Sequence, residues 1–567
     1  MEPPHNNIPK EDTSVLLIWL RRIIWTLAIF FGSIVLLLQF SVVQTYLISR
    51  LTTYISEKTQ TRIYAKRIKI SPFDGVILQD FALVGNDRDT IVSIGNLNIS
   101  LYKNLFYLFS NQLDLSYVGI KDLHLHIITK EGEMKSNLQN FLDKLTGNEK
   151  NKNPNTLLLN IQEIELSDIH VSILDENKGK EQAIYLKGGS MDIDYLDIDC
   201  KDFAINQIIL DNPRYTSTTY KDACEITEEL SVEQIKDELT NMVSDASLAL
   251  ILREFVIRNG YFGIENKLAP KTLSNSNHLD FSNFYYENIN LLLSNVDIQS
   301  KNLFAKLETL NARDNTGFSF NNIKADTILI QPTSAELRSF LIDMGTTHVK
   351  DRLKFSYRDF SAFNDFLNEV SIQADLQESK ILINDLVHFV PSIGASKIVK
   401  NISNEVISLS GKYYGKVNNL NGKEVSFRLG DKLDIKGSFS TRDLLDPDNT
   451  YLNVKLDKFA TSMKKIKMII PDFSPPPNFN KLGSIQFIGR FDGFYEDFVA
   501  YGKLRSDIGI AETDMKLDVT EGSNNAKFRG KLNLKTFNLG IWSGNSALGL
   551  VHFESNVEKG KGLTLNN

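Results

Sequence analysis

Two histidines, His124 and His126, have the spacing in this chain that most directly suggests metal chemistry. Residues two apart on a β-strand point to the same side of a sheet, so their imidazoles could share one metal ion. No cysteine or carboxylate signature of a metal site accompanies them, and the alternating residues Leu123, Leu125 and Ile127 are apolar. The pattern therefore favours a strand that carries the histidines on one face and apolar residues on the other.

Acidic and sulfur-containing residues give no stronger metal signal. Four aspartates lie between Asp192 and Asp199, but an EF-hand calcium loop needs an internal glycine and a terminal glutamate at offsets that are not met here. A solvated strand face is the better interpretation. Two cysteines, Cys200 and Cys224, allow at most one disulfide, and their spacing fits no zinc motif. Two free thiols in packed positions are the simpler prediction.

The chain lacks the short motifs of the common enzyme classes. It has no G-x-S-x-G elbow, P-loop, H-E-x-x-H zinc motif or dinucleotide glycine fingerprint. Its formal net charge is −7, and its lysines and arginines are spread along the chain, which argues against nucleic-acid binding. The short basic pairs Lys66-Arg67 and Lys464-Lys465 could contact anionic head groups or lie at a solvated edge. We therefore expect no enzyme, no cofactor and no nucleic-acid partner.

Apolar and polar residues alternate from Thr59 onward, and this period of two is typical of half-buried strands. The alternation persists for about 500 residues, well beyond one ordinary domain. The sequence therefore predicts a mainly β protein with one apolar face along its strands. The alternating apolar residues that we expect to line this face are Leu123, Leu125, Ile127, Ile164, Leu166, Ile169, Val171, Ile173, Phe255, Ile257, Ile289, Leu291, Leu293, Leu452, Val454 and Leu456.

Turn-forming dipeptides separate these runs. Asn259-Gly260 is the strongest hairpin signal, because both residues tolerate a positive φ. Weaker signals are Gly188-Gly189, Ser167-Asp168, Asp211-Asn212 and Asn421-Gly422. Together they predict a long antiparallel meander of roughly 30 strands. A twisted open sheet of that size must split, curl or be covered, so the alternation fits either a closed sandwich or an open groove that meets acyl chains.

Three helices are predicted to interrupt the strands. They span Ser136–Leu145, Ser231–Leu252 and Thr333–Met344, where apolar residues recur at helical spacing. The second begins with the capping box of Ser231 and Gln234, and it could line the groove mouth or pack at the sheet edge. The proline-rich segment Pro471–Pro477 fits poorly in a sheet interior and is interpreted as a boundary.

An uncharged run from Ile23 to Val43 predicts a transmembrane helix, because a helix of that length spans roughly 30 Å. Arg21 and Arg22 precede it and place the N-terminus in the cytoplasm by the positive-inside rule. No small-residue cleavage site follows, so an uncleaved anchor is favoured over a signal peptide. The apolar spacing of Gln44–Glu57 indicates that the helix continues. The expected anchor residues are Arg21, Arg22, Trp25, Phe30, Phe31, Leu36, Leu37 and Leu38.

Three segments together resemble the AsmA-like family that includes TamB. In Leu51–Leu101 the matching residues are Asp74, Gly75, Leu78, Asp80, Phe81 and Leu83. In Leu376–Ile393 they are Ser379, Ile381, Ile383, Asp385, Leu386, Phe389 and Pro391. In Ile485–Val519 they are Gly489, Phe491, Gly493, Gly502, Leu504, Asp507 and Gly509. The residue pattern of each segment alone is only weakly specific for the family. The order of the three segments behind an N-terminal anchor is more specific.

The resemblance implies a taco-shaped β-groove of the kind found in bridge-like lipid transfer proteins. It implies a cytoplasmic tail over residues 1–16, an anchor over 17–48, an AsmA-like groove over 49–470 and a continuing TamB-like groove over 471–567. The family's characteristic C-terminal domain is not recognised here, so the chain is expected to be an N-terminal portion or a shorter relative.

Two functions follow from the resemblance, both in a Gram-negative bacterium with the anchor in the inner membrane and the bulk of the chain in the periplasm. The first is the carriage of phospholipids between the inner and outer membranes. The alternative is a scaffold for the assembly of outer-membrane proteins together with a TamA-like barrel.

Overall fold

The computed structural model describes residues 21–562 apart from several gaps. The gaps are 23–24, 27–32, 34–35, 37–39, 72–73, 86–88, 104–111, 147–157, 198–199, 223–247, 271–277, 445, 447–448, 471–476 and 523–524. The described residues are mainly β, as the alternation predicts, and their 24 strands are assigned to one open sheet. The chain divides into two compact units, Met1–Ala204 with Pro213–Glu229, and Ile205–Asn212 with Leu230–Asn567. Each is described by itself below.

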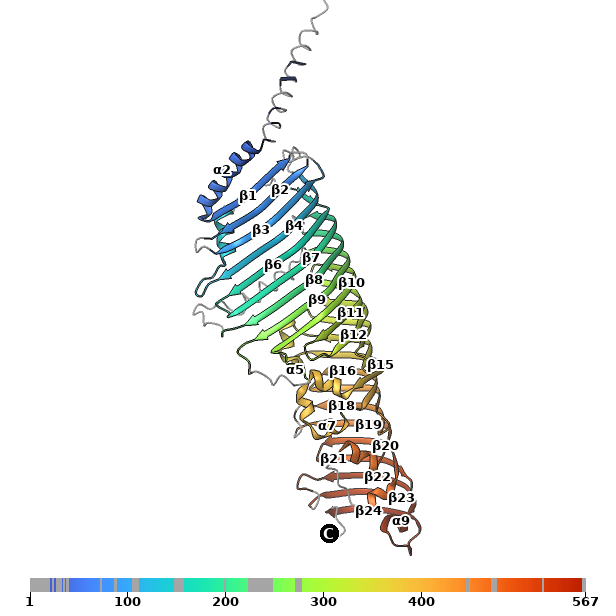
Figure 1. Ribbon diagram of the computed structural model, residues 1–567. Coiled ribbons are helices and arrows are strands. Elements are labelled where there is room, and N and C mark those ends of the chain that lie inside the picture. The colour runs from blue at the N-terminus through green and yellow to red at the C-terminus, as the bar shows by residue number, and fades with distance from the viewer. Residues whose placement is uncertain are drawn as a thin grey trace, which may run out of the picture. The chain divides into compact units, whose positions relative to one another are not determined.

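The N-terminal unit begins with a helix that lies beside the edge strand of the sheet. Its elements are α2 (Ser41–Thr59), β1 (Arg62–Ser71), β2 (Gly75–Val84), β3 (Thr90–Leu101), β4 (Gln112–Thr129), α3 (Asn137–Thr146), β5 (Leu158–Ile161), β6 (Glu163–Asp175) and β7 (Lys180–Asp197). Helix α2 runs along β1 (Figure 1), and the Gln44 amide donates to the Ile70 carbonyl at 2.7 Å and accepts from the Ile70 amide at 3.3 Å. This side chain therefore satisfies backbone groups that an edge strand would leave unpaired. Helix α2 confirms the predicted helical continuation over Gln44–Glu57.

The predicted anchor over Ile23–Val43 falls largely outside the described residues. Within the described part of the chain, no helix is both long enough and apolar enough to cross a membrane.

Strand β4 of the N-terminal unit pairs in parallel with both β5 and β6, whereas the sequence predicts antiparallel pairing throughout. Strand β4 runs parallel to β6, with Leu123 opposite Ile169. Helix α3 lies between these two strands in the chain, where the Ser136–Leu145 helix was predicted. A parallel pair needs a crossover connection, and the segment that contains α3 supplies it.

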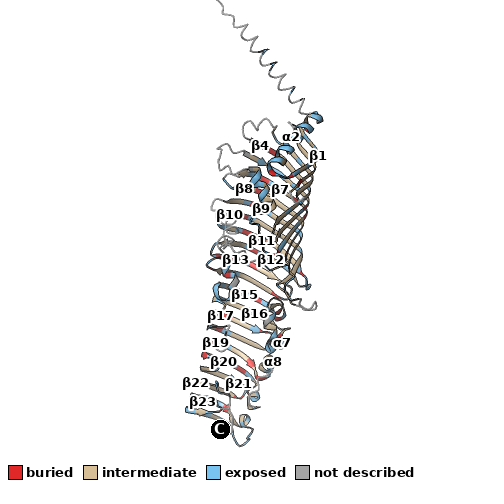
Figure 2. Ribbon diagram, turned by 90° about the vertical axis from the view of Figure 1, so that its left-hand side faces the viewer, coloured by how far each residue is buried: buried red, intermediate tan, exposed pale blue. Residues whose placement is uncertain are grey.

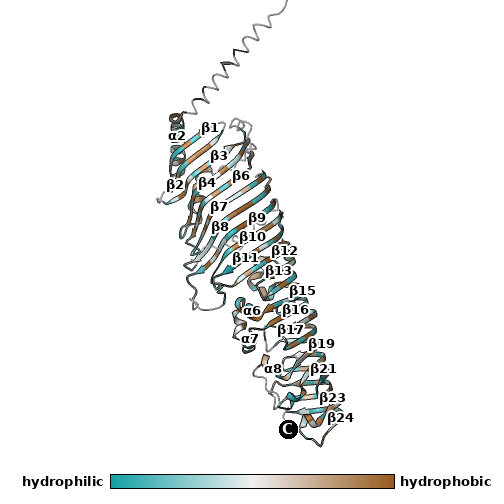
Figure 3. Ribbon diagram, turned by 45° about the vertical axis from the view of Figure 1, so that its right-hand side comes forward, coloured by the Kyte–Doolittle hydropathy of each residue, from teal (hydrophilic) through white to brown (hydrophobic). Residues whose placement is uncertain are grey.

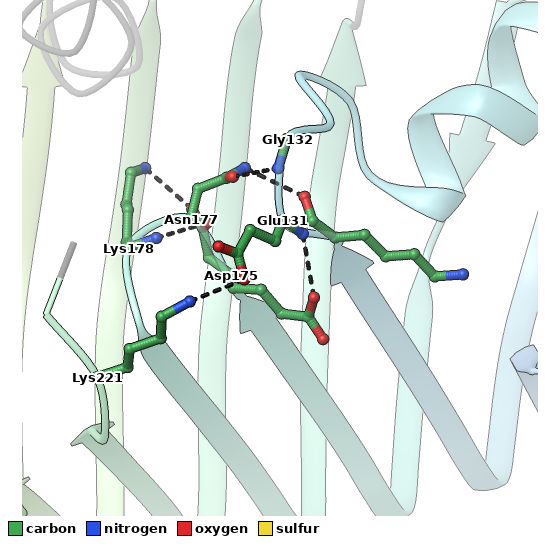
Figure 4. A network of polar contacts seen from close by, with 8 residues as sticks. Glu131, Gly132, Asp175, Asn177, Lys178 and Lys221 are labelled. Carbon is green, nitrogen blue, oxygen red and sulfur yellow. Dashed lines mark hydrogen bonds and ion pairs between the residues drawn. The ribbon is translucent and has the colours of Figure 1, made fainter. Parts of the chain in front are cut away.

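A polar network ties together the strand ends beyond this parallel pair (Figure 4). Asn177 is 7 % exposed, its Oδ1 accepts from the Gly132 amide at 2.8 Å, and its Nδ2 donates to the Glu133 carbonyl at 2.9 Å. Lys221 adds an ion pair to Glu131 at 2.8 Å. The network holds the turn after β4 against the turn after β6.

The C-terminal unit is an antiparallel meander. Strand β8 (Asp202–Thr219) contributes residues to both units. The following strands are β9 (Ala249–Asn266), β10 (Asn283–Gln299), β11 (Asn302–Asp314), β12 (Ser319–Gln331), β13 (Ser334–Asp343), β14 (His348–Ser356), β15 (Ser371–Leu382), β16 (Val406–Lys416), β17 (Asn419–Leu429), β18 (Leu433–Arg442), β19 (Tyr451–Ser462), β20 (Ser484–Phe494), β21 (Asp497–Ser506), β22 (Gly509–Asp518), β23 (Lys527–Asn538) and β24 (Leu550–Lys561).

The predicted hairpin turns are wrong, because all five dipeptides lie inside strands. Asn259 has a φ of 53° within β9, Asp168 has 53° within β6, and Asn212 has 49° within β8. Gly188-Gly189 and Asn421-Gly422 are likewise interior to β7 and β17. A bulge and a type I′ turn both use a residue with positive φ, so the dipeptide alone does not separate them. Each predicted pair of short strands is one long strand with a bend, which lowers the strand count below the expected 30.

The predicted helix over Thr333–Met344 is also wrong, because these residues form β13. Ser339 has a φ of 47°, and the β13–β14 register shifts beside it. The bulge brings Leu337 and Phe340 to one face of the strand, and their spacing of three residues imitates a helix. Of the predicted helix Ser231–Leu252, residues 249–252 belong to β9 and residues 231–247 lie outside the described residues.

Short helices interrupt the meander at strand ends. Between β14 and β15 lie η2 (Phe360–Asp365) and α5 (Phe366–Glu369). Between β15 and β16 lie α6 (Ile383–Phe389), η3 (Pro391–Ala395) and α7 (Lys397–Ile402). Between β19 and β20 lie α8 (Met463–Ile469) and η4 (Pro477–Leu482), and between β23 and β24 lies α9 (Leu539–Ser543). In an antiparallel meander, connections four strands apart fall on the same edge, and Figure 3 shows α6, α7 and α8 along one side. We call this edge the helical rim.

Strands β19 and β20 pair directly, so the sheet continues across the predicted Pro471–Pro477 boundary.

Candidate functional site: the apolar face of the sheet

One face of the C-terminal unit's sheet is apolar from strand to strand. The register pairs residues of like character across β19, β20, β21 and β22. On one face these are Val454, Phe491, Ala500 and Met515, and on the other face they are Lys455, Arg490, Tyr501 and Asp514. The alternation is visible as brown and teal along the strands in Figure 3. The strands therefore separate apolar from charged side chains, as the period of two predicts.

A buried apolar cluster of this face lies on β10 to β15. Leu307, Ala325 and Phe340 are 8 %, 2 % and 3 % exposed and form the centre of an apolar cluster. The side chains packed around them are Leu291, Leu293, Leu310, Ile323, Ile328, Leu337, Ile342, Val349, Leu353 and Leu376. All of these residues belong to the six consecutive strands, and none comes from a helix. In the described residues, this part of the face is therefore buried by neighbouring strand residues and not by a second layer.

Farther along, the same face is only half buried. Phe487, Phe491, Leu504 and Phe528 are all of intermediate exposure, which is the prevailing colour of the strands in Figure 2. The helical segments of this part pack at the strand ends instead, where Met463 joins a cluster that contains residues at the ends of β20 and β23. In the described residues, the middle of the face thus has no covering helix or sheet. Apolar surfaces of this kind usually mark interaction sites.

Two tyrosines report the low polarity around the sheet. Tyr413 lies opposite Ala374 and Gly422, and its ring centroid is 6.3 Å from that of Phe439. Burial raises the pKa of Tyr413 to about 12. Burial and, to a smaller extent, the nearby Asp314 carboxylate raise the pKa of Tyr286 in β10. Both effects are those of a site from which water is partly excluded.

The structure pairs the predicted lining residues directly with one another. In the N-terminal unit, Leu123, Leu125 and Ile127 lie opposite Ile169, Val171 and Ile173, and Ile164 and Leu166 lie opposite Val118 and Ile120. In the C-terminal unit, Phe255 and Ile257 lie opposite Leu293 and Leu291, Ile289 lies opposite Gly260, and Leu452, Val454 and Leu456 lie opposite Gly493, Phe491 and Gly489. That these residues contact lipid remains a prediction.

The histidines of β4 lie on the polar face. His124 is opposite His170, and the two rings stack at 4.6 Å. Among the described residues, no group of three histidines, cysteines, aspartates or glutamates could hold a metal ion. Cys200 is exposed, so its predicted packed position is wrong, and Cys224 lies outside the described part of the chain.

A charged cluster on β13 and β14 was not foreseen from the sequence. Glu336 is 3 % exposed and accepts from Arg338 Nε at 2.7 Å and from Arg352 Nε at 2.8 Å. The Arg338 hydrogen bond, with help from Arg352, lowers the pKa of Glu336 to about 2. No local signal announces this cluster, because Arg352 is brought in by the next strand.

We expect this cluster to make stability depend on acid pH. The pKa of Glu336 is lower in the folded state than its ordinary value, so its contribution is fully present above about pH 4.5 and is lost as the pH falls toward 2. Wild type should lose up to about 3 kcal/mol more than Glu336→Gln between these limits, measured by urea unfolding. Glu378→Gln removes an 87 % exposed carboxylate and serves as the control. A constant difference between wild type and Glu336→Gln at all pH values would contradict the assignment.

Comparison of the chain with protein-family models, with curated proteins and with solved structures finds no match.

Proposed function

We propose that this chain carries phospholipids by holding their acyl chains against the apolar face of its sheet. An N-terminal anchor in the inner membrane would hold the sheet in the periplasm. The observation that carries the proposal is the half-buried apolar face, which no helix or sheet among the described residues covers and whose opposite face carries lysines, arginines and carboxylates among other side chains. The three sequence segments that resemble AsmA-like proteins support the same function.

The energetics favour an acyl chain as the occupant. Each methylene removed from water contributes roughly 0.8 kcal/mol, and the contact needs no defined hydrogen-bond partner. A strand face with side chains such as Val454, Phe491 and Met515 offers aliphatic and aromatic contact without a polar group. Because the same face recurs on consecutive strands, one site can pass an acyl chain to the next.

A matched pair of substitutions on β19 tests the proposal. Val454→Asp places a carboxylate on the apolar face, and Lys455→Asp places one on the polar face of the same strand. The full chain, purified from membranes, is measured by native mass spectrometry with lipid extraction and by transfer of labelled phospholipid between vesicles. We expect several phospholipids per wild-type chain and a loss of transfer of at least about tenfold in Val454→Asp alone, since a carboxylate covered by an acyl chain costs more than about 1.4 kcal/mol.

Urea unfolding of each variant separates loss of transfer from loss of folding. Full transfer by a folded Val454→Asp variant would overturn the proposal. A wild-type chain that carries no lipid and instead retains an unfolded outer-membrane protein would favour the assembly scaffold.

A further inference from the structure

Two neighbouring helices on the helical rim expose lysines and aliphatic side chains together. Helices α7 and α8 are joined by a hydrogen bond from the Asn401 amide to the Met468 carbonyl. Their exposed residues include Lys397, Ile398, Lys400, Lys464, Lys467 and Met468. We call these six residues the basic–aliphatic patch. Ile398 is 39 % exposed and Met468 is 45 % exposed, which is high for aliphatic side chains on packed helices.

The inner sides of the same helices already form a core. Ile402 of α7 is 9 % exposed and clusters with Ile383, Leu429 and, from α8, Ile469. The two helices are therefore held by apolar residues that do not include Ile398 or Met468.

The charge of the patch has one sign. Neither helix contains an aspartate or a glutamate, and together they contain five lysines. The fifth lysine, Lys465, contacts the Asp431 carboxylate at 3.1 Å, and Lys397 of the patch also has an interaction partner. Complementary chemistry therefore requires an anionic partner that also accepts aliphatic side chains.

The composition distinguishes a lipid surface from a protein. Protein interfaces are enriched in aromatic residues and arginine and depleted in lysine, and the patch has the reverse composition. At a bilayer surface, the lysine ammonium groups reach the phosphates while aliphatic side chains enter the acyl boundary. We propose that the basic–aliphatic patch binds the surface of an anionic lipid bilayer. This binding does not depend on the apolar face carrying lipid.

Capture of vesicles by the full chain tests the proposal. The chain is reconstituted into vesicles of phosphatidylcholine, which then capture separate labelled vesicles of phosphatidylcholine alone or mixed with phosphatidylglycerol. Wild type should capture only the anionic vesicles, and high salt should abolish capture. Replacing Lys397, Lys400, Lys464 and Lys467 by glutamine should weaken the apparent affinity at least about 100-fold, since each lysine contributes roughly fivefold.

A control variant with the same change in net charge replaces Lys301, Lys324, Lys436 and Lys531, which are exposed on other strands or turns. It should capture vesicles as wild type does. Ile398→Ser with Met468→Ser should also weaken capture, which purely electrostatic attraction would not predict. Equal loss in the patch and control variants, undiminished capture by the patch variant, or capture unaffected by the serine substitutions would overturn the proposal. If the wild-type chain captures anionic vesicles but transfers no phospholipid, the proposed function is wrong and the binding of the patch to bilayers stands.

Discussion

Asp314→Ala is expected to lower the free energy of unfolding by about 3–5 kcal/mol, because it removes one partner of a buried ionisable pair. The Asp314 side chain is fully buried, and its Oδ2 lies 2.7 Å from Nε2 of His388 in α6. Its Oδ1 accepts from the backbone amides of Thr316 at 2.9 Å and Phe318 at 3.0 Å. The substitution therefore removes the Asp314 acceptor from an imidazole and two backbone donors, and with it one of the contacts that join the β11–β12 hairpin to α6.

Urea denaturation of the full chain measures this loss. Asp314→Asn keeps an acceptor oxygen and should cost less than Asp314→Ala. His388→Phe retains a ring that can stack on Phe318, whose centroid is 4.4 Å from that of His388. If the Asp314 carboxylate stabilises the fold through its contact with the His388 imidazole, Asp314→Ala should lower the free energy of unfolding less in the His388→Phe background than in wild type. A loss below about 1 kcal/mol for Asp314→Ala would show that the pair does not hold the hairpin.

Phe340→Ala is expected to cost about 3–5 kcal/mol, although no helix or second sheet covers its side of the sheet in the described residues. Phe340 is 3 % exposed and lies opposite Ala325, which lies opposite Leu307. Its burial comes from neighbours on the same face. Loss of the ring leaves a cavity that these strand residues can close only by changing the curvature of the sheet.

Phe304→Ala is the matched control. Phe304 is 40 % exposed and lies opposite Asp297 and Leu329 on the other face. Its removal should cost less than about 1 kcal/mol, since little apolar area returns to water. Similar costs for the two phenylalanines, measured by urea unfolding, would contradict the assignment of a packed and an exposed face.

The sequence predicts the faces of this sheet better than its connections. Side-chain alternation is local, so Val454 and Lys455 could be placed on opposite faces before any strand was paired. The sequence does not separate bends from hairpins, because Asn259 in a bulge and an asparagine in a tight turn need the same positive φ. The parallel step from β4 to β6 depends on the path of a crossover segment, and alternation carries no information about it.

The charged sites could not be predicted for a related reason. Asp314 and His388 are 74 residues apart, and no spacing rule joins them. Glu336 and Arg352 lie on adjacent strands, but their meeting depends on the register shift beside Ser339. Pairs of this kind are set by how strands are aligned, which the alternation leaves open.

The helices after β15, β19 and β23 recur every four strands, and η2 and α5 after β14 fall outside this repeat. We call four such strands a module. At about 4.8 Å per strand, such a module advances the sheet by roughly 19 Å. Adding or removing one module preserves strand direction, the side occupied by apolar residues and the edge that carries the helices. An odd number of strands would reverse the strand direction and move the next helix to the opposite edge. Gain or loss of whole modules would therefore change the length of the sheet in steps of roughly 19 Å and leave the apolar face of each module unchanged.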